Sequence, residues 1–184
     1  MTAKKLNLGC GTDIKAGWVN LDSVALTGVN VVHDIEKSPL PFADGEFDEI
    51  LCQDIIEHFN DYIPLLKELW RILQPGGKIL IRVPHFTSKT NFIDPTHRRL
   101  FSASTFDFFL KDSPLKLKRG YILDFAFSGI RSRRITFEAS SPLFFYNRFI
   151  GKIVNSSASL QSFYESTLVS RLFPALNIEI VLIK

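Results

Sequence analysis

The first residues along the chain that could bind a ligand form a glycine-rich turn. Gly9 and Gly11 follow the short apolar run 5–8, with Asn7 before them and Cys10 between them. Two glycines here would let the backbone approach a ligand closely, and in an open parallel sheet the loop after the first strand lies under the ligand. A plain turn would also use two glycines, so the pair alone leaves both interpretations open.

Two acids follow at the ends of the next apolar runs. Asp22 closes the run 18–21, where a carboxylate can accept hydrogen bonds from both hydroxyls of a ribose. Asp34 follows the run 29–32 and could accept from an adenine amino group, with Ile35 lying on the ring. A turn or capping role for Asp22 and a solvated loop position for Asp34 are the alternatives.

Histidine is the natural general base near neutral pH, and two of the four histidines stand where a substrate would lie. His97 sits in the polar turn 94–99, and His85 directly follows the apolar run 78–83. We rank His97 first and His85 second as catalytic candidates. A structural role is the alternative for each.

Strands and helices alternate in the pattern that would bring these residues together. Strands are expected at 5–8, 18–21, 29–32, 47–52 and 78–83, with an amphipathic stretch at 54–73 that breaks near Asn60 and Pro64. A helix is expected at 102–110 and further strands at 121–127, 133–139 and 178–183. This order predicts a mostly parallel α/β sheet covered on both faces, in three layers.

The chain of 184 residues has the size of one domain and shows no linker. We expect a single domain over 1–184, with a ligand-binding half at 1–86 and a substrate-side half at 87–184. Segments 87–96 and 141–163 fit no regular period, and we expect them to build one wall of the site.

The net charge, the apolar runs and the cysteines indicate which partners and which cellular compartment to expect. A net charge of +3 does not favour nucleic acid as a partner, and no apolar run reaches the ~18–20 residues that cross a bilayer. The two cysteines, Cys10 and Cys52, suit reduced thiols better than a disulfide framework. We therefore expect a cytoplasmic protein.

Four blocks between Leu6 and His85 resemble the class I S-adenosylmethionine-dependent methyltransferases: LNLGCGT, GWVNLD, HDIEKSPLPFADGEFDEI and ELWRILQPGGKILIRVPH. The resemblance implies a Rossmann-like seven-stranded sheet whose final strand is antiparallel, and methyl transfer from S-adenosylmethionine. It also implies a set of cofactor-binding residues: Gly9 and Gly11 under the cofactor, Asp22 on the ribose, Asp34 and Ile35 around the adenine, Gln53 near the methionine end, with Asn7 and Cys10 beside the glycines.

Two departures from the family pattern bear on the cofactor. Asn7 stands where the family usually has an acid, and only residues 12–16 separate the glycine turn from the second strand. A parallel crossover usually needs about a dozen residues or more, so we expect the first helix to be shortened. A catalytically silent module that binds the cofactor is the alternative that these departures support.

Other activities fit the residues less well. A dinucleotide dehydrogenase would need a third glycine at Ile14. An RNA methyltransferase is disfavoured because residues 52–55 do not match the Asn-Pro-Pro-Tyr type of motif that many such enzymes carry.

Asp54, Glu57 and His58 would share one face if this stretch were α-helical. The trio resembles the acid, acid, histidine cluster that holds a divalent metal in ubiquinone-pathway O-methyltransferases. A capping Asp54 with a buried Glu57–His58 pair is the favoured alternative, so we expect no metal.

The second half indicates what the acceptor could be. The chain has 17 phenylalanines, and six lysine and arginine residues lie between positions 116 and 134. Aromatic and basic residues suit a small or lipid-like acceptor methylated on oxygen or nitrogen, such as a sugar or lipid-linked molecule, or peripheral contact with an anionic membrane. A phenylalanine-rich core or a homodimer surface is the alternative. The aromatic candidates are Phe106, Phe108, Phe109, Phe125, Phe127, Phe144, Phe145 and Tyr146.

Overall fold

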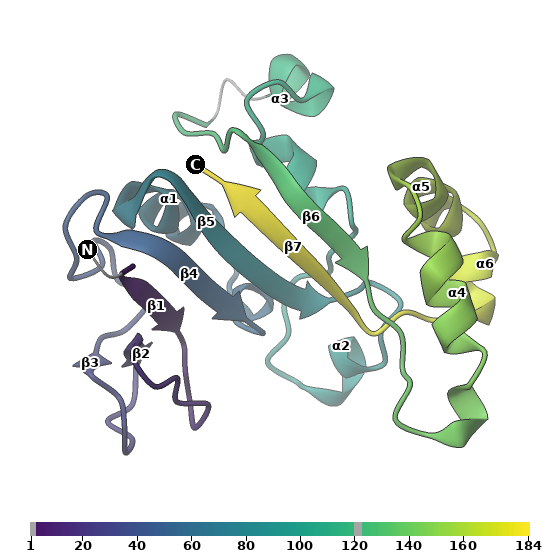
Figure 1. Ribbon diagram of the computed structural model, residues 1–184, viewed down its shortest axis with the longest axis horizontal. Coiled ribbons are helices and arrows are strands. Elements are labelled where there is room, and N and C mark those ends of the chain that lie inside the picture. Colours follow the sequence, from purple (N-terminus) through teal and green to yellow (C-terminus); the bar gives the residue numbers. More distant parts are fainter. Residues whose placement is uncertain (1–2, 120–122) are drawn as a thin grey trace.

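The computed structural model describes residues 3–119 and 123–184. Its centre is a seven-stranded sheet with the order β3-β2-β1-β4-β5-β7-β6 (Figure 1). Strands β1 to β5 are parallel, and β7 is antiparallel to both of its neighbours. The predicted mostly parallel sheet with an antiparallel C-terminal strand is confirmed. The strands are β1 (Lys5–Leu8), β2 (Val19–Asp22), β3 (Val31–Val32), β4 (Phe47–Gln53), β5 (Leu73–Pro84), β6 (Gly129–Ile135) and β7 (Asn177–Ile183).

One face of this sheet carries the core. Residues in register across it alternate with the pleat, so that Leu8, Cys52 and Ile81 point to the same side and are buried. Helix α1 (Ile63–Ile72) covers this face with Leu66 and Leu69, which are fully buried. The covered face therefore holds the main hydrophobic core.

The phenylalanines of the second half complete this core. Phe106 and Phe109 come from the 3₁₀ helix η2 (Thr105–Phe109), and Phe125 and Phe127 from the segment before β6; all four are almost fully buried. Lys116 of α3 (Pro114–Arg119) donates to the carbonyl oxygens of Leu123 and Phe125. The core role left open for these residues is thus the one they have.

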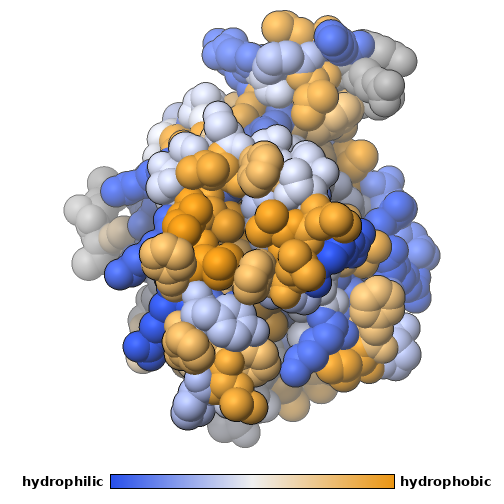
Figure 2. All heavy atoms as spheres, turned by 90° about the vertical axis from the view of Figure 1, so that its right-hand side faces the viewer, coloured by the Kyte–Doolittle hydropathy of each residue, from blue (hydrophilic) through white to orange (hydrophobic). Residues whose placement is uncertain are grey.

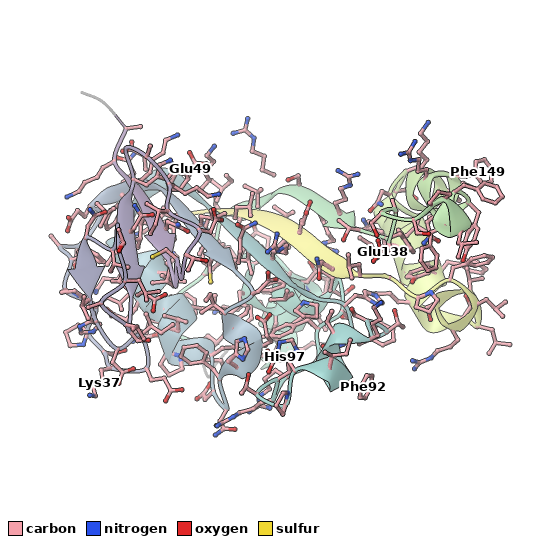
Figure 3. All side chains as sticks on the ribbon, turned by 90° about the horizontal axis from the view of Figure 1, so that it is seen from below. Lys37, Glu49, Phe92, His97, Glu138 and Phe149 are labelled. Carbon is pink, nitrogen blue, oxygen red and sulfur yellow. The ribbon has the colours of Figure 1, made fainter. Side chains whose placement is uncertain are left out.

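The opposite face of the sheet is open, and the expectation of three layers was wrong. Apart from Asn7 and Asn20, which the loop after β1 covers, its side chains are half-buried and mostly polar, and Glu49 forms ion pairs of 3.2 Å with both Lys5 and Lys78. Figure 3 labels Glu49 on this side and His97 on the other. Paired charges need no helix to shield them from water, so among the described residues the helices cover one face only.

The shortened first helix is confirmed. The ten residues between β1 and β2 form turns, and no helix separates these strands. The stretch 54–73 breaks as expected, into a 3₁₀ turn η1 (Ile56–His58) and α1. The expected helix at 102–110 is the 3₁₀ helix η2 instead, and the expected strand at 133–139 runs from Gly129 to Ile135.

Tyr121 and Ile122, in the expected strand 121–127, lie outside the described residues, and residues 123–126 are not a strand. The end of that segment makes a single bridge between Leu110 and Phe127.

Three short helices stand beyond the edge strand β6, at the right of Figure 1. They are α4 (Asn147–Val154), α5 (Ala158–Ser166) and α6 (Val169–Leu172), and with the 3₁₀ turn η4 (Pro142–Phe144) they form what we call the C-terminal lobe, residues 142–173. Val154 and Tyr164 pack its inner side against Ile135 in a second, smaller core. None of the helices in the described part of the chain is both long and apolar enough to cross a bilayer.

Candidate functional site

The carboxyl ends of β1, β2, β4 and β5 meet at one edge of the sheet, and the glycine turn lies there. Gly9 and Gly11 have φ values of +61° and +49°, which favour glycine. A Cβ on Gly9 would lie 2.2 Å from Cδ1 of Ile55, whereas a Cβ on Gly11 would meet nothing within 4 Å. The turn is therefore packed on one side and open above Gly11. Cys10 between them is buried, and burial raises the pKa of its thiol.

Asp22 holds this turn. One carboxylate oxygen accepts a hydrogen bond of 2.7 Å from the Gly11 N–H, and the other accepts one of 3.0 Å from the Val24 N–H. The oxygen that accepts from Val24 also accepts from the Ser23 hydroxyl at 3.4 Å, whereas the oxygen beside Gly11 keeps a further lone pair. Asp22 can therefore still accept a hydrogen bond from a ligand that enters the open space above Gly11.

Asn7 faces the loop that stands where a first helix would lie. Its amide donates to the carbonyl of Asp13 at 2.7 Å and to the side chain of Asn20 at 3.1 Å. Asn20 exchanges hydrogen bonds with the backbone of Lys15 and is held by Asn30. This amide network pins the short crossover to the sheet, so both donors of Asn7 serve the fold.

Asp34 and Ile35 lie in the loop after β3. Asp34 is exposed, and the Glu36 N–H and the Lys37 ammonium lower the pKa of its carboxyl group. Ile35 contributes to the core and lines a small cavity of about 160 Å³ together with Phe59 and Arg98. The structure thus places both residues after β3, and their contacts with an adenine remain a prediction.

Strand β4 ends in a strained turn. Gln53 is its last residue, and Asp54 has a φ of +54°. No other non-glycine residue in the described part of the chain has a positive φ. Arg82 holds the Asp54 carboxylate through its Nε at 3.0 Å and through a terminal nitrogen. Because this turn is not α-helical, Asp54 does not share a face with Glu57 and His58, and that expectation was wrong.

A different trio forms instead. Ligating atoms of Glu57, His58 and His97 all lie within 4.8 Å of one another. The rings of His58 and His97 meet edge to face at 4.8 Å between centroids. Backbone hydrogen bonds from Arg98 and Arg99 to the Glu57 carbonyl bring the 94–99 turn onto η1.

Three buried polar atoms of this trio have no hydrogen-bond partner among residues 3–119 and 123–184: both carboxylate oxygens of Glu57 and Nδ1 of His97. Burial, together with the charge of the nearby Asp54 carboxylate, raises the pKa of Glu57 to about 8. Nε2 of His97 lies 3.7 Å from the Asp94 carboxylate. Buried polar groups are normally paired, so these atoms point to a group that arrives from outside.

These atoms border a cavity of about 320 Å³ at the carboxyl edge of β4 and β5. Thr90 and Ile93 of α2 (Thr90–Ile93) form one wall, and Leu176 and Asn177 form another. The segment 87–96 thus supplies a wall of this cavity. A second cavity, of about 410 Å³, adjoins it through Leu176 and is lined mainly by apolar groups that include Phe92, Phe144, Tyr146, Pro174 and Ala175.

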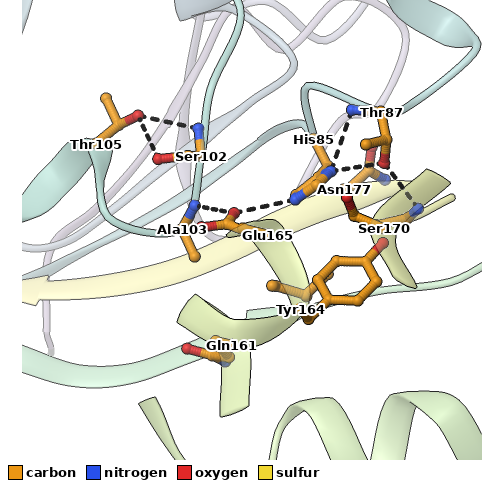
Figure 4. A network of polar contacts seen from close by, with 12 residues as sticks. His85, Thr87, Ser102, Ala103, Thr105, Gln161, Tyr164, Glu165, Ser170 and Asn177 are labelled. Carbon is orange, nitrogen blue, oxygen red and sulfur yellow. Dashed lines mark hydrogen bonds and ion pairs between the residues drawn. The ribbon is translucent and has the colours of Figure 1, made fainter. Parts of the chain in front are cut away.

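His85 lies away from this trio. It is fully buried, its Nδ1 accepts from the Thr87 N–H at 3.2 Å, and its Nε2 lies 3.0 Å from Glu165 of α5. These partners assign the proton to Nε2, which donates to Glu165. Figure 4 shows the network, in which Glu165 also accepts from the Ala103 N–H at 2.7 Å. Nε2 of His85 therefore holds the C-terminal lobe to the end of β5, whereas Nδ1 fixes the turn after β5 through Thr87.

The residues at the edge fit an S-adenosyl nucleoside. The backbone above Gly11 is open, and a carboxylate oxygen with a spare lone pair stands beside it at Asp22. Both suit a ribose whose hydroxyl groups donate hydrogen bonds. The donor set of Glu57, His58 and His97 is close enough to share a proton or a cation; a carboxyl group that is mostly protonated at neutral pH favours the proton.

Some members of the site carry little signal in the sequence. Glu165 is 80 residues from His85, and the helix that carries it has no distinctive pattern. Asp94 could have been predicted as a partner of His97, because the two residues are three positions apart and can meet across a turn. Ile55 over Gly9 and Arg82 on Asp54 depend on the sheet register, which a single sequence does not reveal.

Residues 8–81 match a family model described as a methyltransferase domain. A curated relative, the demethylmenaquinone methyltransferase of Deinococcus radiodurans, is 40% identical over 42 residues, which are 23% of this chain and 17% of that protein. This local match spans about a sixth of that relative's length.

Solved structures resemble the whole chain. A SAM-dependent methyltransferase from Archaeoglobus fulgidus has a TM-score of 0.57 at 18% identity, over 99% of this chain and 86% of its own. An S-adenosylmethionine-dependent methyltransferase from Mesorhizobium loti has a TM-score of 0.52 at 14% identity, over 99% and 91%. At such identities the likeness is one of fold.

Proposed function

We propose that this chain, which has the fold and the domain signature of the class I S-adenosylmethionine-dependent methyltransferases, methylates an oxygen or nitrogen of an amphipathic acceptor. The observation that carries the proposal is the pair of unpartnered buried groups, Glu57 and His97, that border a cavity at the carboxyl edge of the sheet. In a methyl transfer in which the acceptor atom loses a proton, these groups could bind the acceptor atom and take up that proton.

Asp22, Gly9, Gly11 and Cys10 would hold the nucleoside, with Gln53 at its methionine end. When bound, S-adenosylmethionine supplies a methyl group on a sulfonium, which a nucleophile attacks in line. The chain's own residues then have to align the acceptor, exclude water and take up a proton. In our proposal Asp34 and Ile35 border the adenine.

His97 is suited to accept that proton. Nε2 lies on the side of the Asp94 carboxylate, so a proton on Nε2 leaves the lone pair of the buried Nδ1 free. Hydrogen bonds from Thr96 lower the pKa of Asp94 and keep its carboxylate charged. The negative charge beside Nε2 would stabilise the imidazolium that forms when Nδ1 takes the proton.

Glu57 complements this base. With a pKa of about 8 its carboxyl group is mostly protonated at neutral pH, so it can donate a hydrogen bond. Its atoms lie within 4.8 Å of the histidine nitrogens. We infer that Glu57 orients the acceptor atom toward His97.

The shape of the surroundings supports an amphipathic acceptor. The polar trio borders one cavity, and the adjoining cavity of about 410 Å³ is lined by Phe92, Phe144, Tyr146 and Leu176. An acceptor with a polar head and an apolar body would fill both. The cytoplasmic location remains a prediction, and a homodimer remains an alternative use of the aromatic surface.

The test measures transfer of a labelled methyl group to acceptors that pair an aromatic or sugar hydroxyl with an apolar chain. We expect turnover with such acceptors and a fall of about 10²- to 10⁴-fold in His97→Gln, which is the usual contribution of a general base. His33→Gln is the matched control, because the His33 ring lies in the loop after β3 and bonds to the Lys37 carbonyl, outside the cluster of Glu57, His58 and His97.

Binding of S-adenosylhomocysteine separates the alternatives. Calorimetry should give the same affinity for wild type and His97→Gln if His97 acts in catalysis alone. Tight binding with no transfer to any acceptor would favour the catalytically silent module. Equal turnover in His97→Gln and wild type would remove His97 from the mechanism.

A further inference from the structure

The C-terminal lobe, residues 142–173, exposes an unusual amount of apolar surface. Eight of the sixteen exposed large apolar side chains in the described part of the chain belong to it. Figure 2 shows this side of the molecule, with apolar side chains gathered into a broad patch. The members on the lobe are Leu143, Phe145, Phe149, Ile153, Leu160, Phe163, Leu168 and Leu172.

These exposed side chains do not belong to the hydrophobic core of the lobe. The inner side of the lobe is already packed, since Val154, Tyr164 and Ser170 are almost fully buried. Asn155 exchanges two hydrogen bonds of 2.7 Å with the backbone of Ile135 on β6. The lobe is thus anchored in place, and its apolar outer side faces solvent.

The exposed charged side chains of the lobe are all positive. Arg148, Lys152 and Arg171 are exposed, whereas the single acid, Glu165, is half-buried and held by His85 and the Ala103 N–H. On α4 the exposed Phe149 and Ile153 stand four residues apart, each directly after a basic residue. This places an apolar row beside a positive row on one short helix.

The charge pattern discriminates between occupants of this surface. A second copy of the chain would bring the same positive side chains against these, and like charges repel. An anionic bilayer offers negative headgroups next to apolar acyl chains, and aromatic with basic side chains is the usual composition of a surface that lies in that interface. The exposed fraction of Phe149, 66%, makes it free to insert.

The lobe also contributes to the apolar cavity. Phe92 of α2 is 80% exposed and lines the cavity of about 410 Å³, together with Phe144 and Tyr146 of the lobe. A lobe docked on a membrane would therefore place this cavity near the lipid. That link rests on the proposed function, whereas docking itself does not.

We propose that the C-terminal lobe docks onto an anionic membrane surface, with Phe145, Phe149 and Ile153 in the boundary between headgroups and acyl chains and with Arg148 and Lys152 on the lipid phosphates. Binding then depends on apolar insertion and on charge together. Salt should weaken it, because exposed charges are screened at high ionic strength.

Co-sedimentation of the full chain with vesicles of phosphatidylglycerol and phosphatidylcholine tests this, with pure phosphatidylcholine vesicles for comparison. We expect binding to the mixed vesicles only. The double variant Phe149→Ser with Ile153→Ser should bind at least tenfold more weakly. Arg148→Ser with Lys152→Ser should lose about fivefold for each charge removed.

Leu117→Ser is the matched control, because Leu117 is 78% exposed but lies on α3, outside the lobe. Its binding should equal that of wild type. Thermal unfolding of each variant shows that the fold is kept. Vesicle binding that none of the lobe variants changes would overturn the proposal, as would a failure of wild type to bind mixed vesicles. A lobe-dependent dimer seen by light scattering in place of vesicle binding would assign the patch to a second copy instead.

This assay contains no cofactor and no acceptor. A protein that transfers methyl groups but ignores vesicles overturns the docking proposal alone. A protein that binds vesicles through the lobe without transferring methyl groups overturns the proposed function alone.

Discussion

The carboxylate of Asp22 accepts a hydrogen bond of 2.7 Å from the backbone N–H of Gly11, which ties the end of β2 to the turn after β1. Its second oxygen is held by the Val24 N–H. In the function that we propose, a side chain fixed in this way would be preorganised to receive a ribose, because little rotamer freedom remains to be lost on binding.

Asp22→Ala should weaken S-adenosylhomocysteine binding by about 1.5–3 kcal/mol, the scale of losing charge-assisted hydrogen bonds. This corresponds to roughly ten- to a hundredfold in affinity by calorimetry. Asp13→Ala is the control, since Asp13 is in the same turn but its carboxylate pairs only with Lys15 on the surface. An unchanged affinity in Asp22→Ala would remove Asp22 from the site.

Replacing Asn7 with the acid that the methyltransferase pattern has at this position should destabilise the protein. In Asn7→Asp an ionised carboxylate would face the carbonyl of Asp13 and the side-chain oxygen of Asn20, both of which now accept hydrogen bonds from Asn7. We expect a loss of about 2–4 kcal/mol in the free energy of unfolding, measured in urea.

Asn60→Asp provides the comparison, because Asn60 is exposed and should tolerate the change. If Asn7→Asp were as stable as wild type and bound the cofactor more tightly, position 7 would contact the cofactor and the amide network would be dispensable.

The sheet was predictable because its signals are local. Apolar runs at residues 5–8, 47–52 and 78–83 lie on strands, and the break near Asn60 and Pro64 separates η1 from α1. The glycine turn and Asp22 were found for the same reason, since they directly follow strands. Motifs at strand ends can be placed from a single sequence.

The number of layers was misjudged although the sequence carried a signal. Lys78, Leu80 and Arg82 alternate with the buried Ile79 and Ile81 along β5, which is typical of a strand with one face toward water. The β-branched bulk of this strand suggested burial on both faces. Its charged residues indicated the open face.

The cluster of Glu57, His58 and His97 could be predicted only in part. His97 and Glu57 were singled out, but Asp54 was grouped with Glu57 on the assumption of helical spacing. The positive φ of Asp54 and the 3₁₀ turn that follows break that spacing. Contacts such as His85 with Glu165 join residues far apart in the chain, and no local pattern encodes them.

The stability of this protein should depend on pH through Glu57. Burial raises its pKa from 4.5 to about 8, so between these values the folded chain holds a proton that the unfolded chain releases. The contribution to stability is fully present below about pH 4.5 and is lost as the pH rises toward 8. Each pH unit in this window corresponds to about 1.4 kcal/mol at most.

Urea unfolding of wild type and Glu57→Gln across pH 5–8 measures this term. The variant cannot ionise, so its stability should vary less steeply with pH than that of wild type. Glu36→Gln is the control, because Glu36 is exposed in the loop after β3. Parallel pH profiles for Glu57→Gln and wild type would mean that Glu57 is charged in the folded protein.

The network around His85 gives a prediction about the lobe. Glu165 accepts from Nε2 of His85 and from the Ala103 N–H through the same oxygen. Glu165→Ala leaves two donors without a partner at a site where His85 is fully buried, and each such loss costs about 1–3 kcal/mol. We expect the free energy of unfolding to fall by about 2–4 kcal/mol.

Glu165→Gln keeps an acceptor oxygen in the same place and should recover most of this loss. Hydrogen exchange should show faster opening of α5 in Glu165→Ala than in Glu165→Gln, while amides of β1 and β4 exchange alike in both, because the lobe and the centre of the sheet belong to separate cores. If the two variants were equally stable and exchanged alike, the hydrogen bonds to Glu165 would not be what holds the lobe. His85 would then be free for a role at the reacting end of the site.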